Sequence, residues 1–157
     1  MAKTVILLVG LKGSGKTYIG SLLSRQTDIR FLRVEPIWLA LKEGEDGWAK
    51  VADAVDEVLA EYDRVAIESL GGSEGFERLR TALARRYRVQ YVRIRTAPDT
   101  CLRRVQSRST VDHLPVSDDK VAEYNEAALR VELPWDAEID NEGPASDDEI
   151  LGVFSTL

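Results

Sequence analysis

The octapeptide GLKGSGKT, Gly10 to Thr17, fits the pattern G-x-x-x-x-G-K-[ST] at each of its fixed positions. Glycines in such a loop let neighbouring backbone N–H groups point inward together, and at the start of a helix these groups bind an anion. In this pattern Lys16 reaches the β- and γ-phosphates of a nucleotide, and the Thr17 hydroxyl binds the Mg²⁺ that bridges them. The stretch therefore predicts a nucleotide-phosphate site formed by Gly10, Lys12, Gly13, Ser14, Gly15, Lys16 and Thr17.

The residues on either side of this loop provide the structural context that the pattern requires. The apolar run TVILLV, residues 4–9, precedes the loop and is typical of a buried strand. Ile19, Leu22 and Leu23 follow at the spacing of one helix face. Because the complete pattern occurs in the context that it requires, we favour phosphate binding over a simple strand-to-helix turn.

The rest of the chain alternates apolar runs with stretches of helical period. Strands are expected at residues 5–9, 31–34, 65–67, 89–94 and 137–139. Helices are expected over residues 48–62, 76–87, 98–108 and 117–128 and from Ser146 onward, with Ser73, Ser117 and Ser146 as N-caps. Strands that alternate with helices pair in parallel through right-handed crossovers, so the fold class is α/β, a parallel sheet covered by helices.

Several polar residues follow the expected strands. The phosphate loop follows the first strand, Glu35 the second, Glu68 to Gly72 the third and Thr96 the fourth. Ligands of such sheets bind beyond the carboxyl ends of the strands. We therefore expect these residues to lie together at one edge of the sheet.

The composition limits the class of protein. The chain has 157 residues, which is room for one domain, and its net charge of −6 disfavours extended nucleic-acid binding. No stretch is long and apolar enough to span a membrane, and the N-terminus is typical of a strand, so a cytoplasmic protein is expected. The single cysteine, Cys101, is expected to be a buried, inert thiol.

Three further segments resemble parts of the small P-loop kinases, which include dephospho-CoA, shikimate, gluconate and nucleoside monophosphate kinases. RVAIESLGGSEGFERLRTAL, residues 64–83, is similar to their third strand, glycine turn and helix. APDTCLRRVQSRSTVDHLPVS, residues 97–117, resembles their fourth strand end, arginine helix and lid. WDAEIDNEGPASDDEI, residues 135–150, resembles their closing strand and adenine-side loop. The resemblance covers nearly the whole chain and is weakest over residues 27–63.

The resemblance implies a P-loop kinase domain over residues 1–157. Its fold would be a three-layer α/β/α arrangement around a five-stranded parallel sheet with strand order 2-3-1-4-5. It implies ATP and Mg²⁺ as the nucleotide and the metal, and a small molecule as the phosphate acceptor. The acceptor-binding segment would span residues 36–62, and the lid would span residues 104–116.

The resemblance also implies roles for individual residues. Arg104 and Arg108 match the lid arginines, and their i, i+4 spacing places both on one helix face, from which they would close over the triphosphate. Glu68 matches an acidic residue near the metal, and Glu35 matches a carboxylate that orients or deprotonates the acceptor. The residues matched to the adenine-side loop are Asn141 and Gly143.

The sequence leaves alternatives open. The stretch Glu68 to Gly71 loosely imitates a GTPase D-x-x-G segment, but the chain contains no N-K-x-D for guanine. A nucleotide-binding regulatory module is the main rival, and a polynucleotide 5′-kinase is a weaker one. Nucleosides, nucleotides, pantetheine-type molecules and sugar acids are all candidate acceptors, and the chain could be a monomer or a homodimer. Trp38 could stack on an acceptor ring or pack on the core, and His113 is left unassigned.

Overall fold

The structure of the protein is a computed structural model, which describes residues 2–107 and 117–157. Arg108, His113 and most of the expected lid lie outside these residues. The elements are β1 Thr4–Gly10, α1 Lys16–Gln26, β2 Arg30–Leu32, α2 Glu35–Leu39, α3 Gly47–Glu61, β3 Arg64–Ser69, α4 Glu74–Ala84, β4 Arg88–Arg95, α5 Pro98–Ser107, α6 Asp118–Ala128, β5 Ala137–Asp140 and α7 Asp147–Ser155.

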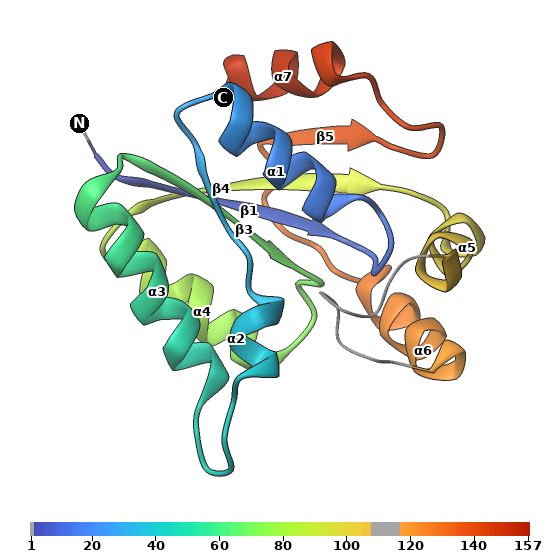
Figure 1. The fold of residues 1–157 in the computed structure, drawn as a ribbon, viewed down its shortest axis with the longest axis horizontal. Helices are drawn as coiled ribbons and strands as arrows, with labels where there is room; N and C mark the ends of the chain where they lie inside the picture. The colour runs from blue at the N-terminus through green and yellow to red at the C-terminus, as the bar shows by residue number, and fades with distance from the viewer. Residues whose placement is uncertain (1, 108–116) are drawn as a thin grey trace.

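The strands form one five-stranded parallel sheet in the order β2-β3-β1-β4-β5 (Figure 1), which confirms the expected topology. The register brings the carboxyl ends of the strands to one edge. Val9 of β1 lies opposite Ser69 of β3, and Gly10 lies opposite Ile94 of β4. The residues that follow each strand therefore start from neighbouring positions.

The central strand β1 is apolar throughout because helices cover both faces of the sheet. Val5, Leu7 and Val9 pack with side chains of α3 and α4, whereas Ile6 and Leu8 pack with side chains of α1 and α7. All five side chains are at most 2% exposed. A continuous apolar run is the pattern of a parallel strand buried on both faces. The expected three-layer arrangement is thus confirmed.

Hydroxyl side chains begin three of the helices, as expected. Ser73 Oγ accepts a hydrogen bond from the Phe76 N–H at the start of α4, and Ser117 and Ser146 cap α6 and α7 in the same way. The sequence reading missed the cap of α3, where the Asp46 carboxylate accepts from the amides of Trp48 and Ala49. Each cap satisfies N–H groups that have no partner within the helix.

The region after β2 differs from the expectation. The strand spans Arg30–Leu32 instead of residues 31–34, and Glu35 opens the short helix α2 instead of directly following the strand. Pro36 lies in the first turn of α2, where its fixed φ favours a helix and its missing N–H costs nothing. Similarly, Tyr62 and Tyr87 fall beyond the ends of α3 and α4.

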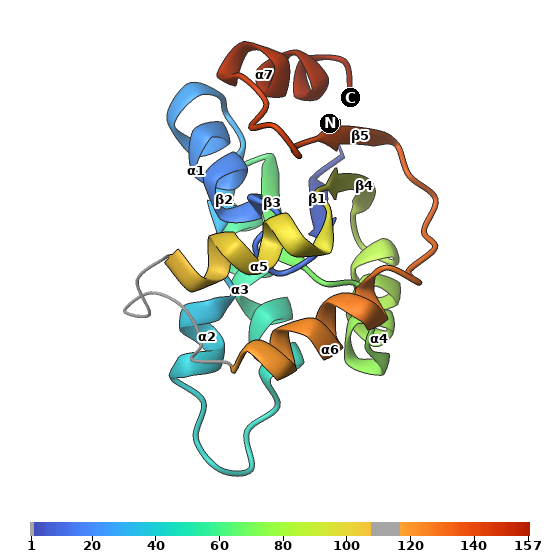
Figure 2. The same ribbon diagram turned by 90° about the vertical axis from the view of Figure 1, so that its right-hand side faces the viewer.

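The helices α5 and α6 lie across the edge of the sheet that the carboxyl ends of the strands form (Figure 2). Cys101 of α5 is fully buried and unpaired, as expected, and burial raises the pKa of its thiol. Over residues 2–107 and 117–157, no helix combines the length and the apolarity that crossing a membrane requires.

A pair of leucines tests the packing of α1 on the sheet. Leu23 of α1 is 0% exposed, whereas Leu39 of α2 is 47% exposed. We expect Leu23→Ala to lower the free energy of unfolding by about 2 to 5 kcal/mol, through lost burial and a new cavity. Leu39→Ala, the matched control, should change it by less than about 1 kcal/mol. Urea unfolding followed by circular dichroism measures both, and equal effects would contradict this packing.

Candidate active site

The loop between β1 and α1 has a backbone that only glycine tolerates at two positions. Gly13 has φ 91° and Gly15 has φ 106°, both in the left-handed region. A Cβ on Gly13 would overlap the Cys101 carbonyl of α5, and one on Gly15 would overlap the Asn141 amide. No side chain of the described residues caps α1, so its first-turn N–H groups are available to an anion.

The loop is held in place through the carbonyl oxygen of Ser14. This oxygen accepts hydrogen bonds from Asn141 Nδ2 at 2.8 Å, Thr96 Oγ1 at 3.2 Å and Arg104 Nη1 at 3.4 Å. The three donors come from the residues after β5, the residues after β4, and α5. The ends of two strands and one helix thus determine where the loop sits.

A second contact ties the loop to α6. Asn125 Oδ1 accepts from the Lys12 amide at 2.8 Å, and Asn125 Nδ2 donates to the Lys12 carbonyl at 3.2 Å. Asn125 is 2% exposed, and the sequence reading missed it. The available signal was its position four residues after the buried Val121, which places a polar side chain on the apolar face of α6.

The side chain of Lys16 folds back onto the phosphate loop. Its ammonium donates to the carbonyls of Gly10 and Leu11, both at 2.7 Å. Burial lowers the pKa of Lys16 to about 8, and the negative charge of Glu68 opposes this shift only in part. This ammonium now contacts the partial negative charges of two carbonyl oxygens, and a bound phosphate would place a full negative charge beside it.

Thr17 and Glu68 form a pair of oxygen donors suited to a metal ion. Thr17 Oγ1 donates to Glu68 Oε2 at 2.8 Å, and Glu68 is 6% exposed at the end of β3. Glu68 Oε1 is buried and has no hydrogen-bond partner among the described residues. The described residues contain no cluster of three or more His, Cys, Asp or Glu that could hold a metal. Mg²⁺ commonly takes one or two protein oxygens plus phosphates and water, so this pair fits Mg²⁺ bound with a nucleotide.

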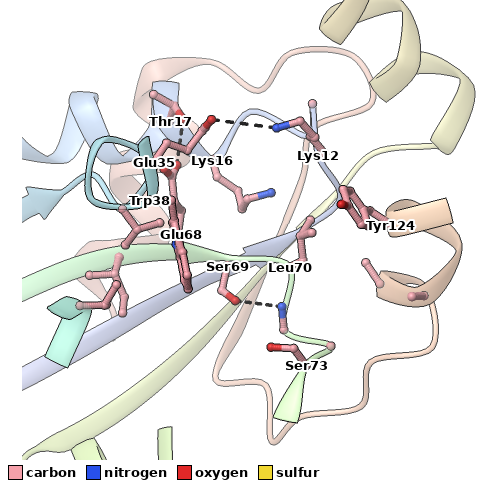
Figure 3. Close-up of a pocket in the computed structure, with 18 of the residues that line it drawn as sticks. Lys12, Lys16, Thr17, Glu35, Trp38, Glu68, Ser69, Leu70, Ser73 and Tyr124 are labelled. Carbon is pink, nitrogen blue, oxygen red and sulfur yellow. Dashed lines mark hydrogen bonds and ion pairs between the residues drawn. The ribbon is translucent and has the colours of Figure 1, made fainter. Parts of the chain in front are cut away.

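The loop opens into a cavity of about 750 Å³, and Figure 3 shows residues that line it. Lys16, Thr17 and Glu68 line its inner end. Glu35 of α2 stands near the loop, with its Oε2 4.0 Å from Lys12 Nζ, and both side chains are largely buried. The structure therefore brings together the phosphate loop, Glu35 and Glu68, as expected from their positions after the strands.

Most of the side chains that line the cavity outside the loop are apolar. Trp38 and Trp48 meet edge to face, with ring centroids 5.1 Å apart and an interplanar angle of 77°. We call these two rings the aromatic wall. Tyr124 of α6 lies on the opposite side of the cavity (Figure 3). Trp38 thus packs on a neighbouring ring and also lines the cavity. Its stacking on an acceptor ring stays a prediction.

The remaining expected site residues flank the loop. Arg104 lines the cavity, but its guanidinium also donates to the carbonyls of Asn141 and Glu142, at 2.8 and 3.1 Å. The Asn141 side chain holds Ser14 with its Nδ2 and accepts the Ala145 amide with its Oδ1. Closure of Arg104 over a triphosphate and contact of Asn141 or Gly143 with adenine stay predictions.

Comparisons with known proteins identify the fold. No family model matches the chain, and no curated protein matches its sequence. Among solved structures, shikimate kinase from Acinetobacter baumannii in complex with shikimate has a TM-score of 0.67 and 18% identity, over 99% of this chain and 93% of that one. The Deinococcus radiodurans tunicamycin resistance protein has a TM-score of 0.68 and 18% identity, over 98% and 95%. The Mycobacterium tuberculosis APS kinase in complex with AMPPNP and APS has a TM-score of 0.64 and 15% identity, over 98% and 96%. The chain has the fold of the small P-loop kinases.

The lowered pKa of Lys16 makes nucleotide affinity depend on pH. Phosphate binding requires the charged ammonium and raises its pKa, so above a pKa of about 8 the free protein must take up a proton to bind. We expect affinity for Mg·ADP to be level from about pH 7 to 8 and then to fall by up to about tenfold per pH unit. Calorimetry in buffers of different ionisation enthalpy measures affinity and proton uptake together.

The Lys16→Ala variant is the control for this pH dependence. It should bind weakly, with an affinity that does not change over the same pH range. A wild-type affinity that stays level up to about pH 9.5 would contradict the lowered pKa of Lys16, and a Lys16→Ala variant that binds as tightly as the wild type would contradict its role in phosphate binding.

Proposed function

We propose that this protein is an ATP-dependent phosphotransferase that moves the γ-phosphoryl group of ATP·Mg²⁺ to a hydroxyl or phosphate of a small-molecule acceptor. One observation carries the proposal. The phosphate loop opens directly into a cavity that has a carboxylate, Glu35, beside the loop and room for a second substrate. A site that only sensed nucleotide would not need this additional room beside the loop.

The residues would divide the work of phosphoryl transfer as follows. The loop amides and Lys16 hold the β- and γ-phosphates, and Thr17 and Glu68 hold Mg²⁺, which neutralises charge on the phosphate oxygens. An acceptor oxygen forms a bond to the γ-phosphorus while the bond from that phosphorus to the β,γ-bridging oxygen breaks, and ADP leaves. Glu35 takes the proton of an acceptor hydroxyl. Positioning and charge stabilisation supply most of the rate.

Other parts of the chain would complete the site. In this proposal residues 36–62, which form α2, α3 and the loop between them, bind the acceptor. Arg104 acts at the triphosphate end, and Asn141 and Gly143 border the adenine. The presence of a shikimate kinase and an APS kinase among proteins of the same fold supports phosphotransfer as the reaction class.

Release of ADP from ATP·Mg²⁺ over a panel of nucleosides, nucleotides, sugar acids and other alcohols tests the function. We expect at least one acceptor class to stimulate release, and Lys16→Ala to lower the stimulated rate by at least about 100-fold. Lys120→Ala, which removes an exposed ammonium of α6 that pairs with Glu123, should leave the rate unchanged. Tight ATP binding with no acceptor-dependent release would favour the regulatory module instead.

Two glutamine variants separate the carboxylates. Glu35→Gln should lower kcat by about 10²- to 10⁴-fold and leave ATP affinity unchanged, because it removes a base and not a phosphate contact. Glu68→Gln should instead raise the Mg²⁺ concentration for half-maximal rate by about 10- to 100-fold. Steady-state kinetics at varied Mg²⁺ measures both variants. An exchange of the two phenotypes would reverse the assignments.

A further inference from the structure

Most of the side chains that line the cavity outside the phosphate loop are apolar. They come from α2, α3, the residues after β3, α4 and α6, and they include Trp38, Trp48, Val51, Leu70, Leu79 and Tyr124, while Ser69 and Ser73 add two hydroxyl groups. Val51 and Leu79 are 1% and 4% exposed and belong to the hydrophobic core. The apolar part of the lining is therefore continuous with the core.

The aromatic wall is held in place by close packing. A Cβ on Gly47 would overlap the Trp38 ring, and a Cβ on Gly75 would overlap the Trp48 ring. A residue larger than glycine at position 47 or 75 would therefore clash with one of the two indole rings. Rings fixed in this way lose little conformational freedom when a ligand packs on them.

Charges in the cavity are confined to the end near the phosphate loop. Among the described lining residues, the basic side chains are Lys12, Lys16 and Arg104, and each contacts the loop or belongs to it. The carboxylates of Glu35 and Glu68 also lie beside the loop, next to Lys12 and Thr17, and Trp38 lies on the same side of the cavity as they do (Figure 3). An anionic acceptor would place its charge beside apolar rings and carboxylates, which is costly without a cationic partner.

Two arginines of the neighbouring region, Arg80 and Arg86, do not change this distribution. Arg80 donates to the Tyr91 hydroxyl and to Glu77, and Arg86 donates to Asp56. These arginines do not line the cavity.

We propose that the acceptor is an uncharged alcohol with a flat apolar or aromatic body. The body packs against the aromatic wall, and the hydroxyl points toward Glu35 and the phosphate loop. This inference rests on the proposed phosphotransferase function and narrows it. The hydroxyl oxygen gains the γ-phosphoryl group, its proton passes to Glu35, and ADP leaves. The anionic acceptors, such as sugar acids and nucleoside monophosphates, are thereby disfavoured.

Matched pairs of compounds that differ in one charge test the inference. The pairs are thymidine and thymidine 5′-monophosphate, methyl shikimate and shikimate, and phenyl β-glucoside and 4-carboxyphenyl β-glucoside. Binding is measured by calorimetry on protein saturated with AMPPNP and Mg²⁺, and phosphorylation by ADP release. We expect the uncharged member of at least two pairs to bind about tenfold or more tightly than its anionic partner, since one uncompensated charge costs more than 1.4 kcal/mol.

Two tryptophan variants show where the acceptor binds. Trp38→Leu should weaken binding of the uncharged compounds at least about fivefold while AMPPNP affinity is retained. Trp135→Leu is the matched control, because Trp135 packs on the core and lines a different cavity. It should leave acceptor binding unchanged.

The outcomes separate this inference from the function on which it rests. Anionic members that bind as tightly as their partners, or no binding by any compound to AMPPNP-loaded protein, would overturn the inference and leave nucleotide binding intact. Equal effects of the two tryptophan variants would also overturn it. Failure to bind AMPPNP at all would overturn the phosphotransferase itself.

Discussion

The position of the phosphate loop depends on one carbonyl oxygen, that of Ser14, which accepts hydrogen bonds from Asn141, Thr96 and Arg104. Glycine-rich segments lose more conformational entropy on folding than others, so a loop of this kind needs contacts that hold it in one conformation. These donors come from the residues after two strands and from α5, and Asn125 adds a fourth point of attachment. The rest of the site is arranged around a loop fixed in this way.

The burial of the sheet on both faces explains why the chemistry gathers at one edge. Apolar side chains dominate within the strands. The buried carboxylate of Glu68 lies near the carboxyl end of β3. There it meets Thr17, the second residue of α1. Glu35, the first residue of α2, lies at the same edge, beside Thr17 and Glu68 (Figure 3). A parallel sheet brings all its carboxyl ends to one edge, so residues from distant parts of the chain share one site.

Much of the fold could be predicted because its signals are local. The apolar run before the loop, the helix face of Leu22 and Leu23, and the caps at Ser73 and Ser117 each depend on residues within a few positions of one another. The short helix α2 was not predicted, because a five-residue helix has too few turns to show a period. Because Pro36 lies in the first turn of this helix, Glu35 is the first residue of α2, whereas it was expected directly after the end of β2.

The parts of the site that were missed depend on contacts between distant residues. Asn125, which was not predicted, binds Lys12 across 113 positions; Asn141 was predicted as a site residue, but its contact with Ser14, across 127 positions, was not. By itself the sequence determined the loop, because left-handed glycines and a helix start are properties of neighbouring residues. Only the tertiary structure decided which side chains hold that loop and which rings line the cavity beside it. The reason is that hydrogen bonds and ring packing depend on distance in space. For residues on different strands and helices, that distance does not follow from their spacing in the sequence.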